Sequence, residues 1–139
     1  MKIFVRYFFL VTLFFSLMVF ISAFYFTPTL SRFASKVEVY TDSSGSDANI
    51  RFYTKGDNPF FAKITGESCV IDNLSLKQLL DYLDAKIYHT ERIDGKLCIY
   101  GYSKKLPYKK QAFNQVINFQ IVILDNALKL GTPVIYGGY

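Results

Sequence analysis

At 139 residues the chain has room for one domain, and its 16 basic and 11 acidic residues give a formal net charge of +5. The first thirty residues hold Lys2, Arg6 and no acidic residue, so the remainder carries 14 basic and 11 acidic residues, a net charge of +3. That bias is too small to indicate a domain that binds nucleic acid. The steady supply of apolar and aromatic residues excludes a disordered chain.

The N-terminal segment carries the strongest signal. Residues 7–26 contain no charged side chain, and as a helix they would span roughly 30 Å, about the hydrocarbon thickness of a bilayer. Lys2 and Arg6 precede this run. Because basic residues stay on the cytoplasmic side, the pattern predicts that the rest of the chain lies outside the cytoplasm.

Two interpretations of this segment stay open. The uncharged run continues through Phe26, which favours an uncleaved membrane anchor. Residues 21–23 (Ile-Ser-Ala) offer a site for signal-peptide cleavage, although isoleucine stands where a small residue is expected. We therefore predict a membrane anchor or signal peptide over residues 1–30 and an extracytoplasmic α+β domain over residues 31–139.

Short strands are expected in the first part of the domain. Alternating apolar residues predict strands over 36–40, 50–54, 60–64 and 68–71, with Gly66 separating the last two. The polar stretch 41–49 is typical of a solvated loop. Its side-chain oxygens resemble those of a calcium-binding loop, but the glycine and the glutamate which that loop needs are missing.

One amphipathic helix is predicted after these strands. Ser75 fits the N-cap and Gln78 stands three residues later, the spacing of a capping box. Four leucines then fall on one face at helical spacing, at positions 76, 79, 80 and 83. So short a helix needs a sheet to cover that face.

The second half predicts more sheet. Asp94-Gly95 joins strands over 86–91 and 96–102, and a hairpin with equal arms places His89 opposite Tyr100 and Glu91 opposite Cys98. The pattern then predicts a single strand over 116–124, with Gln120 outward. A returning strand follows over 128–135, and Pro133 interrupts or ends it. The prediction is an α+β fold: an antiparallel sheet with one amphipathic helix on one face, preceded by a transmembrane or signal helix.

Few residues suggest chemistry. Cys69 and Cys98 are the only cysteines; in an exported domain they could form a disulfide, and their apolar neighbours equally suit two buried thiols. His89 is the only histidine, and Glu91 could orient it as a general base. A small thiol- or histidine-dependent hydrolase is therefore the alternative to a binding module. No catalytic residue, metal ligand or cofactor site is assigned.

A lysine-rich segment is the only candidate binding surface. It could be a solvated loop that protects a sheet edge, or it could contact lipid headgroups or an anionic wall polymer. Nucleic acid is not an expected partner, because the predicted topology places this segment outside the cytoplasm. The residues concerned are Lys104, Lys105, Tyr108, Lys109 and Lys110.

The second half also resembles a known family. The residues that carry the likeness are 88–91 (YHTE), 94–95 (DG), 98–103 (CIYGYS), 117–121 (INFQI) and 130–135 (LGTPVI). They are similar to the YwmB-like family of exported bacterial proteins, although residues 111–115 stand where a tight glycine turn is expected. The resemblance implies an envelope module of unknown role, with a fold likened to the TATA-box-binding protein and no established catalytic residues. Together these features predict a non-catalytic extracytoplasmic module that binds a protein or cell-wall partner.

Overall fold

The structure, a computed structural model, describes residues 2–24, 27–41, 49–53 and 63–138. Residues 42–48 of the loop predicted over 41–49, and the first residues of the strand predicted over 60–64, lie outside these ranges. The chain divides into two compact units, and the second begins at Pro28. Leu30, close to the start of this unit, is buried in its core.

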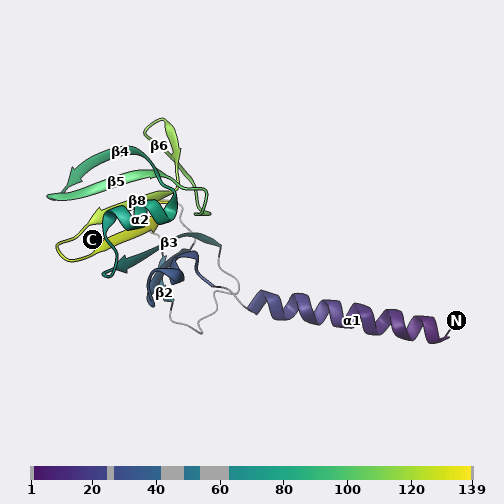
Figure 1. The fold of residues 1–139 in the computed structure, drawn as a ribbon. Helices are drawn as coiled ribbons and strands as arrows, with labels where there is room; N and C mark the ends of the chain where they lie inside the picture. Colours follow the sequence, from purple (N-terminus) through teal and green to yellow (C-terminus); the bar gives the residue numbers. More distant parts are fainter. Residues whose placement is uncertain (1, 25–26, 42–48, 54–62, 139) are drawn as a thin grey trace. The chain divides into compact units, whose positions relative to one another are not determined.

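The first unit contains helix α1, Lys2–Phe24 (Figure 1). The side chains described in it, from residue 5 to residue 21, are all exposed, and most of them are large and apolar. The expected N-terminal helix is therefore present. Within the described part of the chain, no helix has both the length and the apolar character that crossing a membrane requires.

The second unit is built on a seven-stranded sheet in which every neighbouring pair is antiparallel (Figure 1). The strand order is β2-β1-β3-β9-β8-β5-β4, so β2 and β4 form the two edges. A separate hairpin pairs β6 with β7. The strands are β1 Val37–Thr41, β2 Asn49–Tyr53, β3 Ile64–Ile71, β4 Lys86–Ile93, β5 Lys96–Tyr102, β6 Lys110–Ala112, β7 Gln115–Ile117, β8 Phe119–Ile123 and β9 Leu128–Thr132.

Helix α2, Leu76–Leu83, lies on one face of this sheet (Figure 1). The predicted capping box is confirmed, because the Ser75 hydroxyl accepts from the Gln78 amide while the Gln78 side chain accepts from the Ser75 amide. Leu79 and Leu83 are completely buried in the main core, which also contains residues of β8 and β9. The short 3-10 helix η1, Thr29–Arg32, packs Leu30 into the same core.

A second, smaller core covers the opposite face of the sheet. Ile117 from the β6–β7 hairpin and Ile135 from the C-terminal segment pack there on Cys98, Tyr100 and Val122. Because both faces of β8 are covered, Gln120 is only 4% exposed, so the predicted outward position of this side chain is wrong. Its amide oxygen accepts from the Ile135 amide, and its nitrogen donates to the Tyr100 hydroxyl.

The strand predicted over 116–124 is interrupted at Asn118, which separates β7 from β8. The Asn118 side chain is buried, accepts from the Ser103 amide and donates to the carbonyl groups of Ser103 and Leu106. The Asn118 backbone amide still donates to the Gly101 carbonyl, but on either side of this break Ile117 and Phe119 face different cores. A regular alternation had placed them on one face.

Gly66 does not end a strand, contrary to the sequence prediction, because β3 continues through it. The register of β3 against β1 shifts between Tyr40 and Thr41, opposite this glycine. A Cβ atom at Gly66 would lie 2.6 Å from the Thr132 carbonyl oxygen. Glycine therefore permits the close approach of two strands beside a bulge.

Candidate functional site

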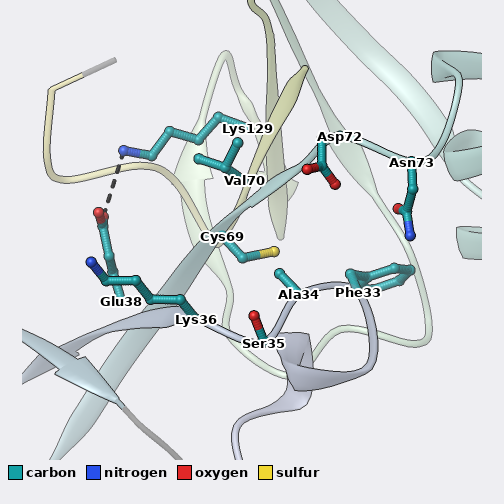
Figure 2. Close-up of a pocket in the computed structure, with 10 residues that line it drawn as sticks. All are labelled: Phe33, Ala34, Ser35, Lys36, Glu38, Cys69, Val70, Asp72, Asn73 and Lys129. Carbon is teal, nitrogen blue, oxygen red and sulfur yellow. Dashed lines mark ion pairs between the residues drawn. The ribbon is translucent and has the colours of Figure 1, made fainter. Parts of the chain in front are cut away.

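A pocket of about 430 Å³ opens in the second unit where β1 begins and β3 ends (Figure 2). One wall is the segment that joins η1 to β1, and the other is the end of β3 with the turn that follows it. An ion pair joins Lys129 to Glu38 on one side of β3, and the Cys69 sulfur points to the other side, toward the segment that carries Ala34 (Figure 2). The lining residues are Phe33, Ala34, Ser35, Lys36, Glu38, Cys69, Val70, Asp72, Asn73 and Lys129.

A buried carboxylate holds the first wall in place. Glu67 on β3 accepts a hydrogen bond of 2.9 Å from the Leu30 amide, at the start of η1. The Tyr108 hydroxyl donates to the other carboxylate oxygen. Burial raises the pKa of Glu67, and the backbone amides of Leu30 and Thr29 partly offset that rise. Glu67 therefore connects the sheet to the segment that leads into the pocket.

Two lining residues, Glu38 and Lys129, belong to a polar network on the second face of the sheet. Lys129 on β9 lies 3.5 Å from the carboxylate of Glu38 on β1, and its ammonium also donates to the Gly138 carbonyl. The Ser68 hydroxyl donates to the same carboxylate and lies 2.7 Å from the Tyr40 hydroxyl. Burial is the main cause of the raised pKa of Tyr40. The network neutralises Lys129, which is almost completely buried.

The thiol of Cys69 lies among the lining residues (Figure 2), and the residue is buried in the main core. Burial, followed by the nearby carboxylates of Glu67 and Glu38, raises the pKa of this thiol to about 12. Lys129 opposes the rise and does not overcome it. Cys69 is therefore a neutral thiol at physiological pH, whereas nucleophilic cysteines need a thiolate.

The disulfide considered between Cys69 and Cys98 is not formed. Cys69 lies on β3 and Cys98 on β5, with β9 and β8 between them in the sheet. Strands three positions apart are separated by roughly 14 Å, well beyond the Cα distance that a disulfide spans. The two cysteines also face different cores. Both are buried small residues, which was the other interpretation of the sequence.

The residues considered for a hydrolase lie on the β4–β5 hairpin. The hairpin register is confirmed, with His89 opposite Tyr100 and Glu91 opposite Cys98. His89 stacks on Phe113 from the β6–β7 hairpin, with ring centroids 4.0 Å apart, and its Nε2 lies 4.0 Å from Glu91. None of these residues lines the pocket that holds Cys69.

The turn that carries Phe113 is tight although it contains no glycine. Both central residues, Phe113 and Asn114, have positive φ angles, of 52° and 57°. A bulky side chain seldom adopts this conformation. The ring contacts with His89 and Tyr100 account for its position at the tip of the hairpin.

Three lysines of the lysine-rich segment contact different tyrosine rings. Lys105 donates to the Tyr82 carbonyl at the end of α2 and lies over the Tyr82 ring. The other two lysines with ring contacts lie over different tyrosines: Lys109 over Tyr102 and Lys110 over Tyr136. Tyr108 turns inward to Glu67, and burial, followed by the Glu67 carboxylate, raises the pKa of Tyr108. Lys104 is exposed. The segment follows β5, which is not a sheet edge.

Sequence reasoning singled out only one residue of the pocket, Cys69. A signal was present in the strands, because Glu38 stands between two valines and Lys129 between two leucines. Alternation places such a charge on the face opposite the apolar residues, which is ordinarily solvated. Here that face is covered, so the two charges meet. Their pairing depends on the β1-β3-β9 strand order, which the sequence pattern does not contain.

Comparison with models of protein families, with curated proteins and with solved structures finds no match for this chain. Across the described residues, no group of three or more histidine, cysteine, aspartate or glutamate side chains is arranged to hold a metal ion.

Proposed function

We propose that this chain is a non-catalytic binding module of the cell envelope, and that its pocket, located where β1 begins and β3 ends, holds a peptide segment. The observation that carries the proposal is the lining of the pocket. Lys36 and Lys129 supply two positive charges, and Glu38 and Asp72 supply two negative ones. A lining with balanced charges suits the alternating donors and acceptors of a peptide better than it suits a polyanion.

The chemistry of the pocket supports binding over catalysis. Its thiol is neutral because its pKa is about 12, and its most buried cation, Lys129, is paired with Glu38. A catalytic cysteine would need a cation or a base that favours the thiolate. The peptide could come from a protein partner or from the peptide part of the wall, which share this chemistry.

Membrane attachment is the second part of the proposal. It rests on the uncharged run of residues 7–26 in the sequence, which ends two residues beyond the described part of α1. Lys2 and Arg6 before this run support an extracytoplasmic position for the domain. The likeness to exported bacterial proteins agrees with this location. A cleaved signal peptide, which would release the domain, is the alternative form of the same proposal.

A photo-crosslinking amino acid at Asn73, on the pocket rim, tests the binding function in cells. We expect an adduct that is lost when Ser35→Trp fills the pocket, and little adduct from the same group at Gln111, an exposed position on β6. The mass of the adduct separates a protein segment from a wall peptide. Equal capture from Gln111, or capture that survives Ser35→Trp, would reject the pocket as the site.

A reporter fused after Tyr139 tests the location separately. Activity outside the cytoplasm is expected, and activity confined to the cytoplasm would contradict the membrane proposal while leaving the pocket result unaffected.

A further inference from the structure

Strand β4 forms one edge of the seven-stranded sheet (Figure 1). It runs for eight residues and pairs with β5 on its inner side. Thr90 and Arg92 on this strand are exposed, and Ile87 is 47% exposed. A strand of this length at an edge offers backbone donors and acceptors to a further strand.

The sequence of β4 and its turn is complementary to itself about Thr90. Residues at equal distances on either side of Thr90 are His89 and Glu91, Tyr88 and Arg92, Ile87 and Ile93, and Lys86 and Asp94. Each pair joins an acid with a base, an aromatic ring with a cation, or two apolar side chains. In an antiparallel pair of two identical strands centred on Thr90, each residue would face its complement from the other copy.

The structure restricts this pairing to the middle of the strand. The β4–β5 register shifts between Ile87 and His89, so residues before His89 do not keep the alternation of the rest. His89 and Glu91 both lie opposite residues of the second face, Tyr100 and Cys98. A two-fold axis through Thr90, perpendicular to the sheet, would therefore place His89 of each copy beside Glu91 of the other on the same face.

We propose that two copies of this chain associate through β4 in antiparallel orientation, with Thr90 on the two-fold axis. The partner is a second copy because the charges of this edge are complementary to themselves. The stacking of His89 on Phe113 holds one member of each charge pair in place. The ladder is short, so the dimer is weak and depends on concentration.

A disulfide trapping experiment on the full chain in detergent micelles tests this dimer. Thr90→Cys would face itself across the axis, at a Cα separation of roughly 5 Å, which a disulfide spans. Arg92→Cys is the matched control, because it is also exposed and lies on the same face of the same strand. In the proposed register its copies are roughly 13 Å apart. The native cysteines are buried in both variants.

We expect mild oxidation to link Thr90→Cys into a dimer on the order of tenfold faster than Arg92→Cys. Equal rates for the two variants, as random collision or pairing through α1 would give, would overturn the proposal. The absence of a disulfide-linked dimer in Thr90→Cys would also overturn it, and would mean that the charges and the bulge keep this edge from pairing.

Charge exchange tests the register independently. In the Thr90→Cys background, Glu91→Lys removes both His89–Glu91 pairs between the two copies. It also places the new lysine of one copy opposite His89 of the other, which gives like charges whenever His89 is protonated. Crosslinking is expected to fall roughly tenfold. Adding His89→Glu restores opposite charges and should recover most of the lost rate. A double variant that crosslinks no better than Glu91→Lys alone, while retaining its circular dichroism spectrum, would refute the proposed register.

Discussion

Replacing Leu79 by alanine tests whether the buried face of α2 holds this helix on the sheet. Leu79 is completely buried in the main core, whereas its neighbour Leu80 is only partly buried. The two positions lie in the same helix and the substitution is the same. Any difference between the two variants therefore reflects burial and not helix propensity.

The magnitude follows from what the substitution removes. Leucine to alanine deletes three carbon atoms, which at about 0.8 kcal/mol for each buried methylene is about 2.4 kcal/mol. The cavity left at a site without solvent access adds to this, so Leu79→Ala should lower the free energy of unfolding by about 3–5 kcal/mol. Leu80→Ala loses only part of the free energy of burying these carbon atoms and leaves little cavity. We therefore expect its free energy of unfolding to fall by about 1 kcal/mol.

Urea unfolding of the full chain in detergent micelles measures both values. The chain has no tryptophan and eleven tyrosines, so near-ultraviolet circular dichroism of the tyrosines reports the loss of tertiary structure. Ser75→Ala removes the hydroxyl of the cap and should lower the free energy of unfolding by about 1 kcal/mol. This variant measures the contribution of the helix start. Losses for Leu79→Ala and Leu80→Ala that agree within about 0.5 kcal/mol would refute the packing described for α2.

Three further predictions concern buried groups. The folded chain binds the Glu67 proton more tightly than the unfolded chain, because burial raises the Glu67 pKa, so the stability from this group falls as pH rises between the two pKa values. Glu67→Gln should flatten the plot of urea midpoint against pH, and an unchanged slope would contradict this assignment. Cys69 should react with iodoacetamide near pH 7 only after unfolding, because its thiol pKa is about 12; mass spectrometry of the folded chain showing rapid modification would disprove it. Gly101→Ala would place a Cβ atom against the Lys86 carbonyl and 2.6 Å from the Phe119 ring, so its urea midpoint should fall well below that of Gly138→Ala, where nothing lies within 4 Å.

The local elements of this fold were predictable because their signals lie within a few residues of one another. The capping box at Ser75 needs only Gln78. The β4–β5 hairpin needs only Asp94 and Gly95, which adopt the positive φ angles of 50° and 80° that its turn requires. From this turn alone the sequence established that His89 lies opposite Tyr100. The N-terminal helix was likewise evident from an uncharged run.

What only the tertiary structure decided is how distant strands are ordered and which faces are covered. Gln120 was expected to face water, and it is buried because the hairpin and the C-terminal segment cover the second face. The pocket arises where β3 continues past the first residue of β1, beside Lys129 of β9, and these three strands are far apart in sequence. Alternation along a strand indicates two faces, but whether the polar one meets water or another segment depends on packing between residues far apart in the chain.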